Sequence, residues 1–228
     1  MNIAIIPARG GSKRIPKKNI KNFCGKPVIG YVISTAINSK LFDAVIVSTD
    51  DEEIKLKALE LGAEVPFMRP KDISDDITPT VPVVAHAIRE CISKNFVFSN
   101  VCCIYPASPL IQIRDIRSVY NLLLENPTNY CLPIAEYPSS IQRSFKINQN
   151  QRLEPFFPRN ELNRTQDLEK AYYDCGQFYW GHKNTWLNSK YLHSNGIGFV
   201  IPSWRVVDID NHDDWERAEF IFKYMKNI

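Results

Sequence analysis

Short apolar runs rich in β-branched residues alternate along this chain with segments of helical periodicity, and this alternation restricts the fold more than any other feature. Residues 2–8 form the first such run, and residues 28–37 carry apolar side chains at helical spacing. The same order recurs at 44–49 and 51–61. Repeated strand and helix order predicts an α/β fold with a mostly parallel sheet and helices on both faces.

The remaining periodic segments continue this pattern to the carboxyl end. Residues 136–174 interrupt it with prolines and polar side chains, so we expect a small insertion there. A chain of 228 residues otherwise fits one domain, 1–228. Further strands are expected at 64–68, 101–105, 129–135, 176–180, 198–202 and 204–207, and helices at 81–93, 113–124 and around Trp215 to Met225.

Composition excludes several classes of protein. Hydrophobic residues make up 44% and charged residues 23%, which is ordinary globular usage and gives no support to disordered, collagen-like or coiled-coil classes. The six cysteines lack the spacing of a metal site, and we expect reduced, mostly buried thiols. No stretch resembles a signal peptide or a membrane span, so we expect a cytoplasmic protein with no membrane partner.

Positive charge is concentrated near the amino terminus. The net charge is only +3, which argues against nucleic acid as a partner, but residues 1–26 contain no acid. A local excess of this kind suits a small polyanion such as a triphosphate. The cations are Arg9, Lys13, Arg14, Lys17, Lys18, Lys21 and Lys26.

Residues 8–19, ARGGSKRIPKKN, directly follow the first predicted strand. Ligands bind beyond the carboxyl ends of parallel strands. Glycines there allow backbone N–H groups to approach phosphate oxygens, and Ser12 can donate a further hydrogen bond. The segment fits neither a Walker A loop nor a dinucleotide fingerprint. A solvated basic loop is the alternative, but the concentration of cations favours a phosphate site.

Two carboxylates, Asp208 and Asp210, follow the strand-like segment 204–207. In extended chain alternate side chains share a face, so both can point into a cleft while Ile209 turns to the core. Two carboxylates with phosphate oxygens and water suit Mg²⁺. They can equally be loop carboxylates near the start of the last helix, and the residues alone do not decide between these interpretations.

Taken together, four motifs resemble the acylneuraminate cytidylyltransferase family over nearly the whole chain. They are segment 8–19, segment 45–50 (VIVSTD), Arg69-Pro70 and Asp208-Ile209-Asp210. The resemblance implies a Rossmann-like nucleotidyltransferase fold, a homodimer, and transfer of CMP from CTP to an acidic nine-carbon sugar with release of pyrophosphate. It also implies Mg²⁺ on Asp208 and Asp210, and an insertion, 136–174, that serves dimerisation and sugar binding.

The resemblance further implies roles for individual residues. The catalytic groups would be Arg9, Lys18, Asp208 and Asp210. Contacts to CTP would come from Ala8, Arg9, Gly11, Ser12, Lys13, Lys18, Asn19, Arg69, Asp76 and Thr78. Contacts to the sugar would come from Tyr105, Arg143, Arg164, Gln177 and Tyr179, with the arginines on its carboxylate. From the residues alone, Arg143 and Arg164 can equally be surface arginines and Tyr179 a core residue.

The sugar-side segments 104–109, 141–143, 164–168 and 174–181 are similar to those of the family branch that uses pseudaminic acid. The alternatives are the same transfer to N-acetylneuraminate, legionaminate or another acidic ketose. A regulator that binds nucleotide without catalysis would not need Asp208 and Asp210. An RNA-binding domain would spread its cations over a face with interleaved aromatic residues, whereas these are confined to one loop.

Overall fold

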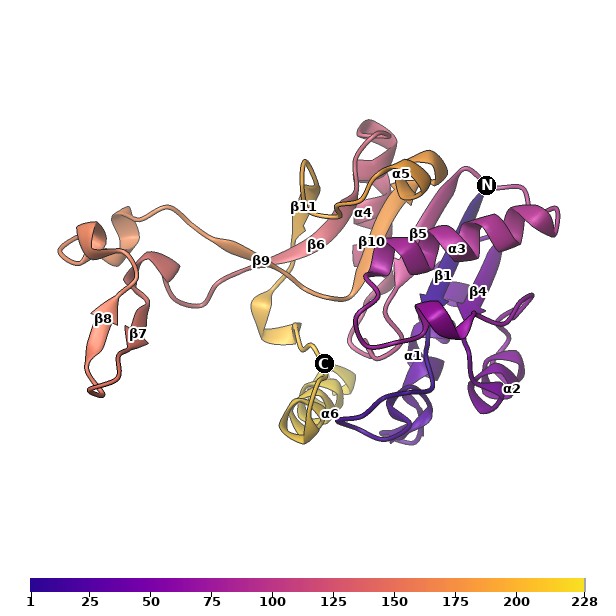
Figure 1. Ribbon diagram of the computed structural model, residues 1–228, viewed down its shortest axis with the longest axis horizontal. Helices are drawn as coiled ribbons and strands as arrows, with labels where there is room; N and C mark the ends of the chain where they lie inside the picture. Colours follow the sequence, from indigo (N-terminus) through magenta and orange to yellow (C-terminus); the bar gives the residue numbers. More distant parts are fainter. Residues whose placement is uncertain (228) are drawn as a thin grey trace.

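The computed structural model describes residues 1–227, and a seven-stranded sheet organises the chain (Figure 1). Across the sheet, the order of hydrogen-bonded neighbours is β11-β6-β10-β5-β1-β4. Strand β9 pairs with β6 outside this path. They comprise β1 (Asn2–Pro7), β4 (Ala44–Ser48), β5 (Asn100–Ile104), β6 (Cys131–Glu136), β9 (Tyr172–Asp174), β10 (Phe178–His182) and β11 (Ile197–Val200).

The sheet is mixed but mostly parallel. Strand β1 runs parallel to both β4 and β5, and β11 runs parallel to β6. Strand β10 lies antiparallel between β5 and β6, and β9 is antiparallel to β6. The predicted α/β fold with a mostly parallel sheet is confirmed, and the reversed strands are β9, at the end of the predicted insertion, and β10, shortly after it.

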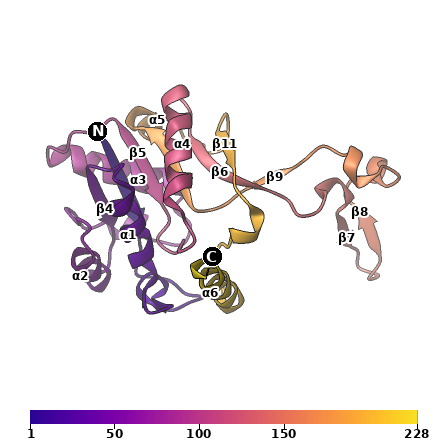
Figure 2. The ribbon, with the colours of Figure 1, turned by 180° about the vertical axis from the view of Figure 1, so that it is seen from behind.

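Helices cover both faces of the sheet (Figures 1 and 2). Side chains of α1, α2 and α4 join one core cluster, and those of α3 and α5 join another on the opposite face. Within residues 1–227 no helix combines the length and apolar character needed to cross a bilayer. The helices are α1 (Val28–Ser39), α2 (Glu52–Glu60), α3 (Thr80–Ser93), α4 (Ile113–Glu125), α5 (Lys183–Asn188) and α6 (His212–Lys226).

The alternation of side chains along β1 explains why both faces are apolar. Ala4 and Ile6 enter the cluster formed with α1 and α4, whereas Ile3 and Ile5 enter the cluster formed with α3. Each of these four residues is at most 1% exposed. A strand buried on both faces reads as a continuous apolar run, as β1 does in the sequence.

Two predicted strands are absent from the sheet. Residues 64–68 form only isolated bridges, Ile46 to Glu64 and Thr49 to Met68, because the segment crosses the edge strand β4 only briefly. Residues 204–207 were expected to be extended, but a short 3-10 helix occupies Ser203–Arg205. The chain after it reaches α6 without pairing with any described strand.

An arm leaves the sheet between β6 and β9 (Figures 1 and 2). Two long connections carry it away from the body, and its far part includes the hairpin β7 (Phe145–Ile147) and β8 (Leu153–Pro155). We call residues 137–171 the arm. Its apolar side chains include Ile147 and Leu153, both 65% exposed, and Leu162, 97% exposed.

Candidate active site

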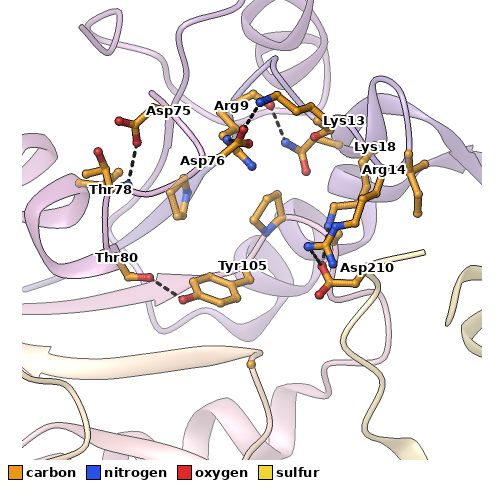
Figure 3. A pocket seen from close by; sticks show the side chains of 18 of the residues that line it. Arg9, Lys13, Arg14, Lys18, Asp75, Asp76, Thr78, Thr80, Tyr105 and Asp210 are labelled. Atoms are coloured by element: carbon orange, nitrogen blue, oxygen red, sulfur yellow. Dashed lines mark hydrogen bonds and ion pairs between the residues drawn. The ribbon is translucent and has the colours of Figure 1, made fainter. Parts of the chain in front are cut away.

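A cleft of about 460 Å³ opens beyond the carboxyl ends of β1 and β5 (Figure 3). This is the edge of a parallel sheet where ligands bind. Five segments line it: the basic loop after β1, the loop 69–80 before and into α3, the loop 105–108 after β5, the turn at Gly176, and residues 208–210.

The basic loop is held close to neighbouring segments of the chain at Gly10 and Asn19, and at Gly10 the approach leaves no room for a side chain. A Cβ on Gly10 would lie 2.6 Å from a carboxylate oxygen of Asp51, so no other residue fits without displacement. The Gly10 N–H donates to Asp50 Oδ1 at 3.0 Å. Asn19, which is 4% exposed, donates to the Arg9 carbonyl at 2.9 Å. These contacts fix both ends of the loop around the cleft.

Asp76 reaches across the cleft to the cations of the basic loop (Figure 3). Its carboxylate pairs with Arg9 and, at 2.5 Å, with Lys13. Hydrogen bonds first from Lys13 and then from Arg9 lower the pKa of Asp76. The neighbouring Asp75 accepts from the Thr78 N–H at 2.7 Å and holds the turn that presents Asp76. A protein carboxylate therefore neutralises two cations implied for the triphosphate.

Asp208 and Asp210 line the opposite side of the cleft. Lys18 Nζ lies 3.8 Å from Asp210 and donates to the Ile209 carbonyl at 2.6 Å, while Arg14 pairs with Asp210 at 2.8 Å. Burial lowers the pKa of Lys18, and the two carboxylates oppose that shift. Asp208 is an exposed residue, but its carboxylate is partly shielded from water. This shielding is the main cause that raises the pKa of Asp208, and the negative charge of Asp210 is the next.

These carboxylates fit a divalent cation only together with a ligand. Among residues 1–227 no group of three or more His, Cys, Asp and Glu side chains could hold a metal ion alone. Asp208 and Asp210 supply hard oxygen donors beside the cations of the basic loop. Mg²⁺ commonly takes one or two carboxylates and completes its shell with phosphate oxygens and water. The donor set therefore suits a cation that arrives with a nucleotide.

Arg69 presents a buried guanidinium to the same cleft. The residue is 6% exposed, and within the described residues its Nε and one terminal nitrogen have no hydrogen-bond partner. The nearest carboxylate oxygen, on Asp50, is 4.0 Å away. Burial lowers the pKa of Arg69. An unpaired buried donor is costly, so this guanidinium is suited to an acceptor carried by a ligand.

Tyr105 forms the cleft wall on the side of the predicted sugar contacts. Its hydroxyl lies 2.5 Å from Thr80 Oγ1, and burial raises its pKa to about 12. The ring packs edge-on against Tyr179, whose hydroxyl donates to Asp174 at 2.8 Å. Tyr179 is 2% exposed and belongs to the core cluster of α3. It supports Tyr105 from behind rather than lining the cleft.

The cleft brings together most of the residues expected to bind nucleotide. Its lining includes Arg9, Ser12, Lys13, Lys18, Asn19, Arg69, Asp76, Thr78, Tyr105, Asp208 and Asp210. Six further predicted site residues lie outside the lining: Ala8, Gly11, Gln177 and Tyr179 on the body, and Arg143 and Arg164 on the arm. Arg14, Thr80, Ser108 and Gly176 line the cleft without having been assigned a role in advance.

A sequence profile described as Cytidylyltransferase matches residues 3–198, which include the basic loop, Arg69 and Tyr105. The chain belongs to the cytidylyltransferase family. The match ends before Asp208 and Asp210, so those carboxylates are tied to the site by the geometry of the cleft.

Curated relatives of this cytidylyltransferase resemble it over most of its length. A protein of Campylobacter jejuni named pseudaminic acid cytidylyltransferase is 42% identical, covering 97% of this chain and 96% of the relative. N-acylneuraminate cytidylyltransferase B of Danio rerio is 31% identical, covering 95% of this chain and 50% of the relative. Relatives named for pseudaminic acid and for N-acylneuraminate are therefore both similar to this chain. The identity is higher to the relative named for pseudaminic acid.

Solved structures support the fold independently. A CMP:2-keto-3-deoxy-manno-octonic acid synthetase complexed with CTP superposes with a TM-score of 0.74 at 15% identity, covering 98% of this chain and 99% of the other. The 4-diphosphocytidyl-2C-methyl-D-erythritol synthase of Anaerococcus prevotii gives 0.59 at 16% identity, covering 97% and 98%. At these identities the likeness concerns the fold, and it confirms the predicted Rossmann-like nucleotidyltransferase architecture.

Proposed function

We propose that this protein transfers CMP from CTP to the anomeric hydroxyl of pseudaminic acid and releases pyrophosphate. The observation that carries the proposal is 42% identity over 97% of the chain to a relative named for this activity. The cleft supports it, because cations, two carboxylates and an unpaired buried guanidinium converge at one edge of the sheet.

In this proposal the basic loop binds the triphosphate. Arg9 and Lys13 face the cleft and exchange Asp76 for phosphate oxygens when CTP enters. Lys18 is held by the Ile209 carbonyl and by Asp210, so its ammonium is already oriented before CTP binds. Arg69 donates to an acceptor on the cytosine or the ribose.

Asp208 and Asp210 would hold Mg²⁺ together with phosphate oxygens. When bound, the ion would neutralise charge that develops on the reacting phosphate. The sugar hydroxyl oxygen forms a bond to the α-phosphorus, the bond from that phosphorus to the bridging oxygen breaks, and the hydroxyl proton passes to water. Arg9, Lys13 and Lys18 stabilise the departing pyrophosphate, since nucleotidyl transfer depends mainly on positioning and charge.

We also propose that the protein is a homodimer joined through the arm. Five large apolar side chains on the arm are more than half exposed: Phe145, Ile147, Leu153, Phe156 and Leu162. Exposed apolar surface of this extent marks an interaction site. Arg143 and Arg164 also lie on the arm, so they would contact sugar in the cleft of a neighbouring copy. Sedimentation at working enzyme concentration tests the dimer, and a monomer would contradict it.

A cytoplasmic location completes the proposal. All six cysteines are free thiols, and five of them are buried. Unpaired cysteines in this number fit a reducing compartment. Fractionation of the native host followed by immunodetection tests the location, and recovery in a secreted fraction would contradict it.

The function is tested by measuring pyrophosphate release over a grid of four nucleoside triphosphates and several acidic sugars, with Mg²⁺ present. We expect release with CTP and pseudaminic acid and formation of the CMP-sugar by mass spectrometry. Turnover with CTP and a different sugar would support cytidylyl transfer but would contradict pseudaminic acid as the acceptor. No turnover in any combination would contradict the function.

A further inference from the structure

A buried ion pair ties the carboxylate segment to the body. We call residues 203–211 the strap, since they lead from the sheet across the cleft to α6. Arg205 in the strap forms two hydrogen bonds to the carboxylate of Asp115, one of them at 2.9 Å. Arg205 is 1% exposed and Asp115 is 3% exposed, although 90 residues separate them in sequence.

Stability alone is a poor explanation for this pair. Removing two charges from water is expensive, and apolar residues of similar volume often stabilise a protein equally well or better. Arg205 Nε also has no partner among residues 1–227, which adds to the cost. A buried pair of this kind can instead specify one arrangement of the segments that it joins.

Each of the two segments joined by the pair adjoins residues that line the cleft. Asp115 lies in the first turn of α4, which follows the cleft-lining loop 105–108. Arg205 precedes Asp208 by three residues. Between them Val206 and Val207 are buried, at 6% and 7% exposure, so the chain has little freedom to move.

The other end of the strap is fixed as well. Asn211 and Asp214 form a capping box at the start of α6, and Asp214 also accepts from the Asp210 N–H at 3.0 Å. In the middle, Ile209 is 1% exposed and its carbonyl accepts from Lys18. Asp208 and Asp210 therefore stand on a short segment anchored at both ends and at its centre.

We propose that Arg205, held by Asp115, is a positioning residue that sets the orientation of Asp208 and Asp210 toward the cation of the nucleotide. The proposal rests on the proposed cytidylyl transfer. Arg205 touches neither substrate nor cation and acts only through the strap. Loss of a group that orients metal ligands typically weakens metal binding by about 10- to 100-fold.

The test uses the full chain and Mn²⁺ as a spectroscopic substitute for Mg²⁺. Three proteins are compared with wild type: Arg205→Lys, the double variant Arg205→Met with Asp115→Leu, and the control Val119→Ala, which truncates a buried residue of α4 that faces the sheet. The double variant removes both charges, so its thermal stability is expected to be retained while the fixed geometry is lost.

Mn²⁺ binding in the presence of CTP is measured by electron paramagnetic resonance, and CTP binding in EDTA by calorimetry. We expect the affinity for Mn²⁺ to fall about tenfold or more, relative to wild type, in the two Arg205 variants. This is the usual effect of losing a group that orients a metal ligand. CTP binding in EDTA should fall less than Mn²⁺ binding, because Arg9, Lys13 and Arg69 do not contact the strap and, of the cations expected to bind CTP, only Lys18 does. Amides 206–210 should exchange faster in both, whereas Val119→Ala should leave Mn²⁺ binding and this exchange unchanged.

Unchanged Mn²⁺ binding and unchanged exchange in both Arg205 variants would overturn the positioning role, and so would equal losses in Val119→Ala. Failure of the wild type to bind Mn²⁺ with CTP, or to release pyrophosphate, would instead overturn the proposed function on which the role depends.

Discussion

Asp76 forms ion pairs with both Arg9 and Lys13, and so neutralises two cations that line the cleft. The arrangement keeps two like charges compensated while no phosphate is bound. In the proposed function, CTP would have to displace this carboxylate before its phosphates could reach these side chains. Asp76 would therefore compete with the triphosphate.

Asp76→Asn should strengthen CTP binding, because the amide cannot neutralise the cations as the carboxylate does. The gain should be modest, about two- to fivefold in Kd, since exposed ion pairs contribute little. Calorimetry with CTP in EDTA measures it, with Asp72→Asn, an exposed acid of the same loop outside the cleft lining, as control. Weaker binding in Asp76→Asn would mean that its carboxylate serves the nucleotide directly.

Lys18→Ala should impair use of CTP far more than it changes thermal stability. A hydrogen bond from a charged donor is worth about 1.5–3 kcal/mol, which corresponds to about 10- to 150-fold in kcat/KM for CTP. Lys21→Ala, a cation of the same segment outside the cleft lining, is the matched control. Equal CTP kinetics in wild type and Lys18→Ala would show that the loop is only a solvated basic surface.

Asp210→Asn should lower kcat by about 100-fold or more while the protein stays folded, because a metal ligand loses its charge. Asp213→Asn, an exposed acid three positions beyond Asp210 in the first turn of α6, serves as control. Turnover and circular dichroism are compared over a Mg²⁺ titration. Near-normal turnover in a folded Asp208→Asn, Asp210→Asn protein would refute the metal assignment.

Pseudaminic acid should be preferred over N-acetylneuraminate. It carries a second acylamino group and a terminal methyl in place of hydroxyls, and the cleft offers Tyr105 on the expected side. Apolar contacts discriminate by roughly 10- to 200-fold per misplaced group, so weak activity on related sugars is tolerable. The measurement is kcat/KM for both sugars under one set of conditions. Equal or greater efficiency with N-acetylneuraminate would replace the proposed sugar.

Thiol reactivity should be confined to Cys24 in the native protein. The other five cysteines are buried, and burial raises the pKa of Cys91 and Cys175 to about 12. A raised pKa keeps a thiol protonated and unreactive until the pH approaches it. At pH 8 Ellman's reagent should react slowly with one thiol, and with all six after denaturation. Rapid reaction of several native thiols would contradict the described core.

Periodicity in the sequence predicted those elements whose structure depends on their own side chains. The buried run of β1 and the helical spacing of α1 are local signals, and both elements form where expected. The direction of β10 is not a local property. It depends on the turn at Gly176, with φ +60°, and on pairing with β5 about 75 residues earlier in the chain.

In the cleft, too, features that depend on neighbouring residues were predictable and features that depend on distant residues were not. The cations of the basic loop are adjacent in sequence, so a local positive surface beside the first strand was predictable from the sequence alone. The pairing of Asp76 with Arg9 and that of Arg205 with Asp115 join segments 67 and 90 residues apart. Neither has a sequence pattern, because an acid and a base at such separation meet only through the fold. The roles assigned to all the site residues stay predictions, those inside the cleft as well as those of Arg143, Arg164 and Gln177 outside it.

The central place of β10 bears on how the chain is made. Strands β4, β1 and β5 emerge from the ribosome first and can pair with one another, but the second edge of β5 stays open until residues 178–182 are synthesised. An unpaired edge strand can recruit other chains. Nascent protein therefore passes through a long interval, including synthesis of the whole arm, in which an incomplete sheet is open to aggregation.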